Sequence, residues 1–464
     1  MLKEKPLDYA TSTAGSLATA LAARQISAVE LCDEAIRTIE AKDGPINAVV
    51  VRDFERAREA AKAADAALVR GESAPLLGVP MTVKDSQHVA GLPTTWGLAP
   101  FKDWRASADS TGVARLKAAG AVILGKTNIP PNLGDWQAAN PVYGRTNNPH
   151  DLSRSPGGSS GGAAAALAAG MVPLEFGSDI GGSIRVPAHM CGVFGHKPTW
   201  DLIPQTGHAP PGVEGPGAGV QFGVIGPLAR SAADLQLALN VLAGPERELA
   251  RGYALNLPPP RGEALRDYRV LIIDAHPLAA VDDEVLAPLH ALADRLERAG
   301  AEVSRASPLL PDFAGYQETY LAMLGAIMGR GEPGAEPRMN TFAYMNGLDA
   351  IERARASWAE LFNEFDVVLA PPFGTAAFPH ADEPQWEKRT HTINGQPTPY
   401  GAQIAWPGIA TFPGLPATCA PIGKTNGGLP VGVQIIGPAY EDRTTIAFAG
   451  LIEREGFREG ANPA

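Results

Sequence analysis

Between residues 75 and 245, short apolar runs typical of buried strands alternate with alanine-rich runs typical of helices. The apolar runs are 76–83, 121–124 and 172–176, and the helical runs are 110–119 and 162–169. Such alternation is the pattern of α/β proteins, in which helices cover a buried sheet. We therefore predict an α/β fold with a mixed, mostly buried β-sheet that is covered on both faces by helices.

The segments on either side of this block carry further signals. Residues 7–70 have apolar side chains at helical spacing, and Ser27 with Glu30 three residues later forms a capping-box pattern. Two more predicted helices lie at 231–243 and 282–299, and predicted strands lie at 268–274, 367–369 and 431–436.

The chain contains no internal repeat, and its proline-rich stretch at 256–262 is the best candidate for a linker. Because the second half has strands but no motif of its own, we expect a single domain over residues 1–464. Within it we expect N-terminal helices at 7–70, a core at 75–245, and a C-terminal half at 263–464 that completes the sheet and a pocket.

Charge and cysteine content exclude several classes of protein. The 39 lysine and arginine residues are outnumbered by 50 aspartate and glutamate residues, for a net charge of −11, and no basic cluster is present. We therefore expect no nucleic-acid partner. Cys32, Cys191 and Cys419 are too far apart for a disulfide framework. The most apolar run, 163–174, is shorter than the roughly 20 residues of a membrane span. These features predict a cytoplasmic protein with no membrane partner.

Two short motifs match known patterns by letter only. Residues 120–127 fit G-x-x-x-x-G-K-T, but a phosphate-binding loop follows a strand, whereas the variable residues here are themselves strand-like. Residues 157–161 fit G-x-S-x-G, but the polar segment 151–156 before them is no strand. The later histidines His380 and His391 lie in proline-rich polar surroundings, which do not support a catalytic role. His189, Cys191 and His196 lack a fourth ligand at metal-site spacing, so we expect no metal.

A third set of residues, made of serines, glycines and one lysine, has the composition of a serine nucleophile with its base and an oxyanion site. Glycine-serine clusters at 157–162 and 177–183 are tightly flanked by apolar elements, and Lys84 ends an apolar strand. A serine hydroxyl becomes a nucleophile when a neighbouring base takes its proton, and desolvation can lower the pKa of a lysine enough for that task. Successive glycines let backbone N–H groups converge on an oxyanion. The pattern indicates acyl transfer.

On these motifs the sequence resembles the amidase signature family of serine hydrolases. The resemblance is dense over 78–199 and continues through 226–231, 366–371 and 428–438. It rests on Gly-Val-Pro-x-x-x-Lys-Asp at 78–85, Gly-Gly-Ser-Ser-Gly-Gly at 157–162 and Gly-Gly-Ser-Ile-Arg at 181–185. The resemblance implies the amidase signature fold, a Ser–cis-Ser–Lys triad and no cofactor, with 75–245 as the catalytic core.

Matched position by position, the resemblance assigns the catalytic roles. The nucleophile, the general base and the bridging serine after a cis peptide bond fall on Ser183, Lys84 and Ser159. The oxyanion-hole N–H groups fall on Ile180, Gly181, Gly182 and Ser183. The supporting hydrogen-bonded residues fall on Ser160, Asp179 and Arg185. The implied reaction is amide hydrolysis, in which neutral Lys84 draws a proton from Ser183 through Ser159 and a Ser183 acyl-enzyme is then hydrolysed.

The substrate is expected to be a small neutral molecule. The predicted pocket walls are Met81, Trp136, Phe373 and Trp406, with Ile180 and the loop 132–136, and all but this loop are mainly apolar. Val186, just beyond the nucleophile, offers no cation for a carboxylate. We therefore expect aryl or alkyl amides, with esters and carbamates left open, and we expect the loops 132–136 and 205–220 to set substrate choice. A homodimer is left open.

Two alternatives from other classes stay open. One is the amidase subunit of a tRNA-dependent amidotransferase, against which the Phe-Ala-Ser-Ser-Leu-Asp-Gln pattern of such subunits is absent before 226–230. The other is a nucleotide-binding protein that uses Lys126 in the pattern at 120–127. Glutaminase activity with partner subunits would favour the first alternative, and ATP affinity lost in Lys126→Ala would favour the second.

Overall fold

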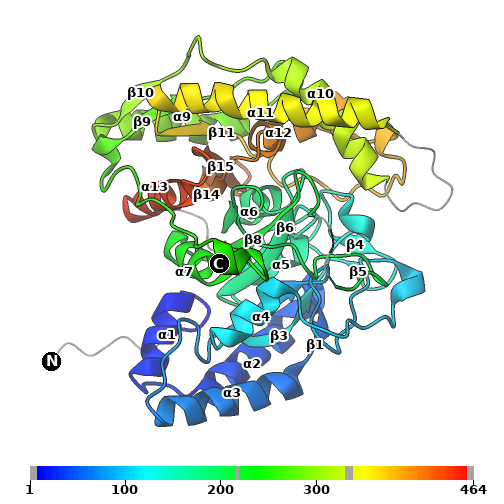
Figure 1. Cartoon of the computed structure of the whole chain (residues 1–464), viewed down its shortest axis with the longest axis vertical. Coiled ribbons are helices and arrows are strands. Elements are labelled where there is room, and N and C mark those ends of the chain that lie inside the picture. Colours follow the sequence, from blue (N-terminus) through cyan, green and yellow to red (C-terminus); the bar gives the residue numbers. More distant parts are fainter. Residues whose placement is uncertain (1–7, 216, 218, 330–337, 457–464) are drawn as a thin grey trace.

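The centre of the computed structural model, which describes residues 8–215, 217, 219–329 and 338–456, is an eleven-stranded sheet (Figure 1). The strand order is β1–β3–β2–β6–β8–β7–β14–β15–β11–β9–β10. The strands of the first half are β1 (Val49–Arg52), β2 (Pro80–Lys84), β3 (Val122–Thr127), β6 (Leu174–Asp179), β7 (Phe194–Lys197) and β8 (Val224–Ala229). Those of the second half are β9 (Arg269–Ile272), β10 (Glu302–Ser304), β11 (Val367–Ala370), β14 (Ala417–Lys424) and β15 (Pro430–Ile436).

The sheet is mixed, as the sequence predicted. Strand β2 pairs in parallel with β3 and β6, and β9 pairs in parallel with β10 and β11, whereas the remaining neighbours are antiparallel. The two halves of the chain meet where β7 pairs with β14, with His196 opposite Thr418. Strands from both halves thus form one sheet, while the folding of 1–464 as a single unit stays a prediction.

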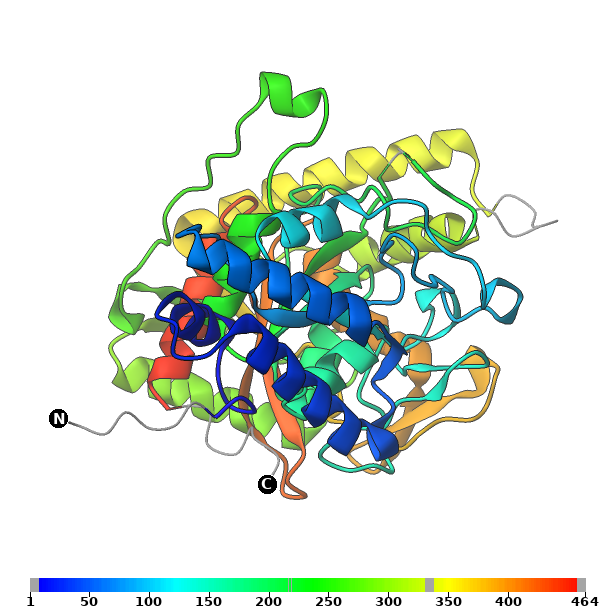
Figure 2. The ribbon, with the colours of Figure 1, turned by 90° about the horizontal axis from the view of Figure 1, so that it is seen from below.

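Helices lie on both sides of this sheet. Those before residue 245 are α1 (Ala14–Ala22), α2 (Ala28–Ile46), α3 (Phe54–Val69), α4 (Thr111–Ala118), α5 (Gly161–Ala168), α6 (Arg185–Cys191) and α7 (Ala232–Leu242). Those after it are α8 (Leu249–Gly252), α9 (Asp283–Arg298), α10 (Phe313–Met328), α11 (Thr341–Glu364), α12 (Ala405–Thr411) and α13 (Asp442–Arg454). In Figure 1, α1–α3 lie at one end of the molecule and α10 and α11 at the other. Figure 2 shows α1–α3 across the near side.

Most of the predicted elements are present, with one error near the N-terminus. The capping box is confirmed, because Ser27 Oγ accepts from the Glu30 N–H at 3.1 Å and Glu30 Oε2 accepts from the Ser27 N–H at 2.9 Å. The purely helical prediction for 7–70 is wrong over β1, which pairs with β3 at the edge of the sheet. A four-residue strand is too short to show a period, so its partner, distant in sequence, decides its structure.

The pattern at 120–127 forms no phosphate-binding loop, because β3 begins at Val122 and includes three of its four variable residues. Lys126 is fully buried, and its ammonium group lies 2.7 Å from Pro93 O, 2.8 Å from Thr94 Oγ1 and 3.3 Å from Asp85 Oδ1. A buried lysine with these partners does not present its amine to a phosphate group. In the part of the chain that the structure describes, no helix is long and apolar enough to cross a membrane.

Candidate active site

The side chain of Lys84 lies at the end of β2, entirely buried, and its amine meets two serine hydroxyls. Its Nζ is 2.7 Å from Ser159 Oγ and 2.9 Å from Ser178 Oγ. Burial lowers the pKa of this amine to about 7, although Asp179 and Glu175 nearby act in the opposite direction. Near neutral pH a large fraction of the amine is therefore unprotonated, with a lone pair next to Ser159.

Ser159 stands between a tight loop and the start of α5. The Gly158–Ser159 peptide bond is cis. A side chain at position 158 would not fit, since a Cβ there would come within 2.5 Å of Asp135 O and 2.6 Å of the Gln137 nitrogen. The close approach of the 135–137 backbone thus explains the glycine before Ser159. Ser159 itself is fully buried.

Ser183 lies in the loop that joins β6 to α6, where most neighbouring polar groups are already paired. The Gly182 N–H donates to Asp179 Oδ1 at 2.9 Å and the Ile184 N–H donates to Asp179 Oδ2 at 3.0 Å. By contrast, no acceptor among the described residues pairs with the N–H of Ile180, Gly181 or Ser183. Three of the four predicted donors of this loop are therefore free to stabilise an oxyanion beside Ser183, whereas Gly182 is not, because its N–H is bound to Asp179.

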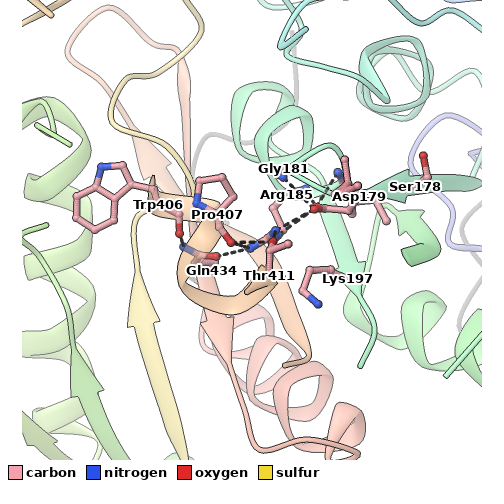
Figure 3. Close-up of polar contacts among 12 residues, drawn as sticks. Ser178, Asp179, Gly181, Arg185, Lys197, Trp406, Pro407, Thr411 and Gln434 are labelled. Carbon is pink, nitrogen blue, oxygen red and sulfur yellow. Dashed lines mark hydrogen bonds and ion pairs between the residues drawn. The ribbon is translucent and has the colours of Figure 1, made fainter. Parts of the chain in front are cut away.

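The loop of Ser183 is also held by a buried ion pair, shown in Figure 3. Arg185 and Asp179 are both fully buried, and their side chains meet at 2.9 Å. Burial by itself would raise the pKa of the Asp179 carboxyl, but Arg185 and the hydrogen bonds to the carboxylate outweigh it and lower the pKa to about 2. Asp179 is therefore a permanent anion that anchors the loop.

Arg185 reaches beyond this ion pair into the C-terminal half of the chain. Its guanidinium donates to Thr411 Oγ1 at 2.7 Å and to Pro407 O and Gln434 Oε1 at 2.9 Å. Figure 3 shows the Arg185 guanidinium between Asp179 on one side and Pro407, Thr411 and Gln434 on the other. Such a planar fork of five donors suits a site that must satisfy several acceptors at once. Ser160, the remaining supporting residue, donates its N–H to Ser183 O at 3.1 Å.

Three contacts of the site were not predicted from the sequence. Ser178 binds Lys84, and its only signal was its place between Gly177 and Asp179. The Tyr320 hydroxyl, on α10, donates to the Ile180 carbonyl at 2.6 Å. The Trp136 indole donates to the Gly181 carbonyl at 2.9 Å. The last two contacts fix the carbonyls of the nucleophile loop, and no local pattern around Tyr320 points to this role.

Four of the predicted pocket walls are buried side chains, whereas Ile180 is half-buried and Asn132 in the loop 132–136 is exposed. Met81 belongs to the main core, and Trp136 packs with Phe373 at a ring distance of 4.9 Å. Trp406 belongs to another cluster, and its indole points away from the Arg185 network in Figure 3. Contact of these four residues with substrate stays a prediction.

The two loops expected to set substrate choice differ in how they are held. In the loop 132–136, Asp135 is bound by Arg389 at 2.6 Å and by the Tyr400 hydroxyl at 2.7 Å. The loop 205–220 is anchored at its start, where the His88 N–H donates to Gly207 O at 2.9 Å. Residues 216 and 218 of this loop lie outside the described residues. Over the described ranges, no group of three or more His, Cys, Asp or Glu side chains is arranged to hold a metal ion.

Comparison with known proteins shows the family of the chain. The Amidase family model matches residues 30–329 and 313–446. The acylamidase of Rhodococcus erythropolis is 33% identical over 485 residues, which cover 97% of this chain and 96% of that protein. One subunit of the glutamyl-tRNA(Gln) amidotransferase from Roseiflexus castenholzii is 32% identical over 486 residues and 94% of both chains. The crystal structure of a bacterial aryl acylamidase superposes with a TM-score of 0.83 at 27% identity over 97% of both chains. The chain therefore belongs to the amidase signature family of hydrolases.

Proposed function

We propose that this enzyme hydrolyses the C–N bond of a small, neutral carboxylic amide through an acyl-enzyme on Ser183. The observation that carries this proposal is the 2.7 Å contact between the buried Lys84 amine and Ser159 Oγ, next to the loop that holds Ser183. A neutral buried amine can accept a proton, and a hydroxyl can pass one on while receiving another.

In the acylation step, Ser183 Oγ attacks the amide carbonyl carbon. The Ser183 proton passes to Ser159 as the Ser159 proton passes to Lys84 Nζ. The carbonyl oxygen becomes an oxyanion, which the N–H groups of Ile180, Gly181 and Ser183 stabilise. When the C–N bond breaks, the proton held by Lys84 returns through Ser159 to the leaving nitrogen, so an amine departs and an ester to Ser183 remains.

Deacylation repeats the same steps with water as the nucleophile. Water attacks the ester carbonyl while its proton moves through Ser159 to Lys84. The tetrahedral intermediate collapses to a carboxylic acid, and the proton returns to Ser183 Oγ. Because the same relay serves both halves, loss of Lys84 or Ser159 should slow each half-reaction.

The chemistry near Ser183 favours an uncharged acyl group. Val186 is fully buried, and the nearby Arg185 has its donors committed to Asp179, Thr411, Pro407 and Gln434. No cation on this loop is left to pair with a substrate carboxylate. Aryl or alkyl amides fit best, and activated esters or carbamates could acylate the same serine.

Activity profiling tests this proposal. The purified chain should hydrolyse members of a panel of aryl and alkyl amides, and a fluorophosphonate probe should label it at Ser183, as located by peptide mass spectrometry. Ser183→Ala should abolish both signals, and Ser153→Ala, at an exposed serine, should change neither. Hydrolysis that survives in Ser183→Ala would contradict the assignment of the nucleophile.

A second candidate is the amidase subunit of a tRNA-dependent amidotransferase. The 32% identity to the glutamyl-tRNA(Gln) amidotransferase protein of Roseiflexus castenholzii supports it. Such a subunit would release ammonia from glutamine only with its partners. Glutaminase activity of the isolated chain with and without partner subunits distinguishes the two, since the amide hydrolase proposed above needs no partner.

A further inference from the structure

The mechanism leaves one buried acidic side chain next to Lys84 without a role. Glu175 lies on β6 and is fully buried. Its Oε1 accepts from Thr127 Oγ1 at 2.7 Å, and its Oε2 accepts from the Phe176 N–H at 2.7 Å. Burying a carboxyl group costs free energy of folding, so we expect an interaction that explains why Glu175 is buried here.

The strand register locates this carboxyl group above β2. Glu175 on β6 lies beside Thr82, and Thr127 on β3 lies beside Lys84. Because β2 separates β6 from β3, the bond between Glu175 and Thr127 crosses over β2. Thr82 and Lys84 are two residues apart and share a face of the sheet, which is the face that Glu175 crosses. The carboxyl group therefore lies close to the Lys84 side chain.

We propose that Glu175 is a positioning residue for the general base: its ionised carboxyl, held over β2, keeps the Lys84 amine basic enough to take the Ser183 proton through Ser159. This inference rests on the proposed function. Burial alone would make the amine a weak base, and a nearby anion stabilises its protonated form. A stronger base accepts the proton more readily in the transition state.

The two groups influence one another in the directions that this role requires. Burial raises the pKa of Glu175 to about 7, with hydrogen bonds and Lys84 acting to lower it. Glu175 in turn raises the pKa of Lys84 against the effect of burial. The two groups should therefore titrate as a coupled pair in the neutral range.

The other titratable groups near this face of the sheet each have a partner or a shifted pKa. Asp179 raises the pKa of Lys84 more than Glu175 does, and it is paired with Arg185. Helix α5, which packs against β2, β3 and β6, carries only Gly, Ala and Leu, and β8 has no titratable side chain. Lys126 on β3 is paired with Asp85.

The remaining titratable groups lie on α2 and in the loop 205–220. On α2, Asp43 is paired with Arg52, and burial raises the pKa of Cys32. Burial, followed by Lys84, lowers the pKa of His208 to about 3, so this imidazole is neutral.

The test compares pH profiles and needs no knowledge of the natural substrate. Ser183 is labelled with a fluorophosphonate under single-turnover conditions from pH 5 to 10. In this reaction Ser183 Oγ forms a bond to phosphorus, fluoride leaves, and the Ser183 proton departs through Ser159 to Lys84. The rate should rise with pH as the Lys84 amine loses its proton, and the midpoint of that rise is the measured quantity.

In Glu175→Gln, which keeps the shape and removes the charge, the midpoint should move to lower pH by about one unit. The plateau rate at high pH should fall several-fold because the base is weaker. Glu175→Asp keeps the charge and should keep the wild-type midpoint. Asp234→Asn removes another buried carboxyl group, which binds the N–H groups of Ala14 and Gly15 far from Lys84, and should leave the midpoint unchanged.

Thr127→Val covers the case in which Glu175→Gln does not fold. It removes one hydrogen bond to the ionised carboxyl, so Glu175 is less ionised and the midpoint moves in the same direction by a smaller amount. An unchanged midpoint in every variant that folds would overturn this inference and leave the proposed function standing. Failure of the probe to label the wild-type chain would instead count against the proposed function.

Discussion

The hydroxyl group of Tyr320 lies 2.6 Å from the carbonyl oxygen of Ile180, a residue 140 positions earlier in the chain. This contact joins α10 to the loop that carries Ser183. A peptide unit is planar, so the Ile180 carbonyl and the Gly181 N–H point in opposite directions within one rigid group. By holding the carbonyl, Tyr320 fixes the direction of a donor that the proposed mechanism assigns to the oxyanion.

Tyr320→Phe should therefore lower kcat for an activated ester by about fivefold, since the hydrogen bond contributes about 1 kcal/mol. KM and the melting temperature should change little, because the ring and its packing remain. Tyr316→Phe is the matched control, since its hydroxyl lies 3.5 Å from Ser357 Oγ and does not touch the loop. Equal losses in the two variants would contradict a specific role for Tyr320.

Ser183→Ala should remove all detectable turnover of every substrate while the far-UV circular dichroism spectrum and the melting temperature stay close to those of the wild type. The change deletes one hydroxyl group in a loop whose backbone is held by Asp179, Tyr320 and Trp136. If activity persisted, Ser159 would become the leading candidate for the nucleophile. Pre-steady-state kinetics with an activated ester would show whether a burst of acylation remains.

Lys84→Met should abolish activity and yet raise stability at neutral pH. The pKa of Lys84 is about 7 in the folded chain and 10.5 for an ordinary lysine. Between these values the unfolded chain binds one proton more than the folded chain, so the free energy of unfolding of the wild type rises with pH. Methionine does not titrate, and the stability advantage of the variant should shrink from pH 7 to pH 10. Urea unfolding across this range measures it, and a constant difference would argue against a neutral Lys84.

Arg185→Met should destabilise the protein by about 3–5 kcal/mol, because it leaves Asp179 as a buried anion without its partner. Activity should be lost with the loop geometry even at temperatures where the chain is folded. Arg305→Met is the control, since Arg305 and Asp294 form an exposed pair at 3.3 Å that should contribute less than about 1 kcal/mol. Similar melting temperatures for the two variants would mean that the buried pair does not anchor the loop.

Lys126→Met distinguishes the strand from a nucleotide-binding loop. The wild type should show no ATP binding by isothermal titration calorimetry, because the Lys126 amine is enclosed by Pro93, Thr94 and Asp85. The variant should lower the melting temperature, since Asp85 loses its buried partner. Saturable ATP binding that disappears in the variant would restore the nucleotide-binding alternative.

Local chemistry made much of the fold predictable from the sequence. The helix that begins after Ser27 carries its own start signal, and the apolar runs around Lys84 and Phe176 are strands because their side chains must be buried on both faces. Strand β1 escaped prediction because its four residues gain stability only by pairing with β3. The strand order as a whole depends on such distant partners, which single-sequence patterns do not contain.

The sequence also singled out a candidate catalytic set, through motifs in which serine, glycine and lysine have few other uses, and the roles of these residues stay predictions. Supporting residues were harder to find. Tyr320 and Gln434 belong to ordinary amphipathic or apolar segments, and only the fold brings them to Ile180 and Arg185. The same physics limited the pocket prediction, since an apolar aromatic such as Trp406 has the same sequence signature in a binding site and in a core.

The Arg185 fork has a consequence for the order of events during synthesis. Arg185 and its acceptor Gln434 are 249 residues apart, so the ribosome releases Ser183 long before the groups that hold its loop. A nascent chain that ends before 405–436 contains the complete proposed triad but lacks the carbonyl, hydroxyl and amide that orient Arg185. Catalytic competence should therefore arise only once the second half has been made, which spares the cell a reactive serine on every unfinished chain.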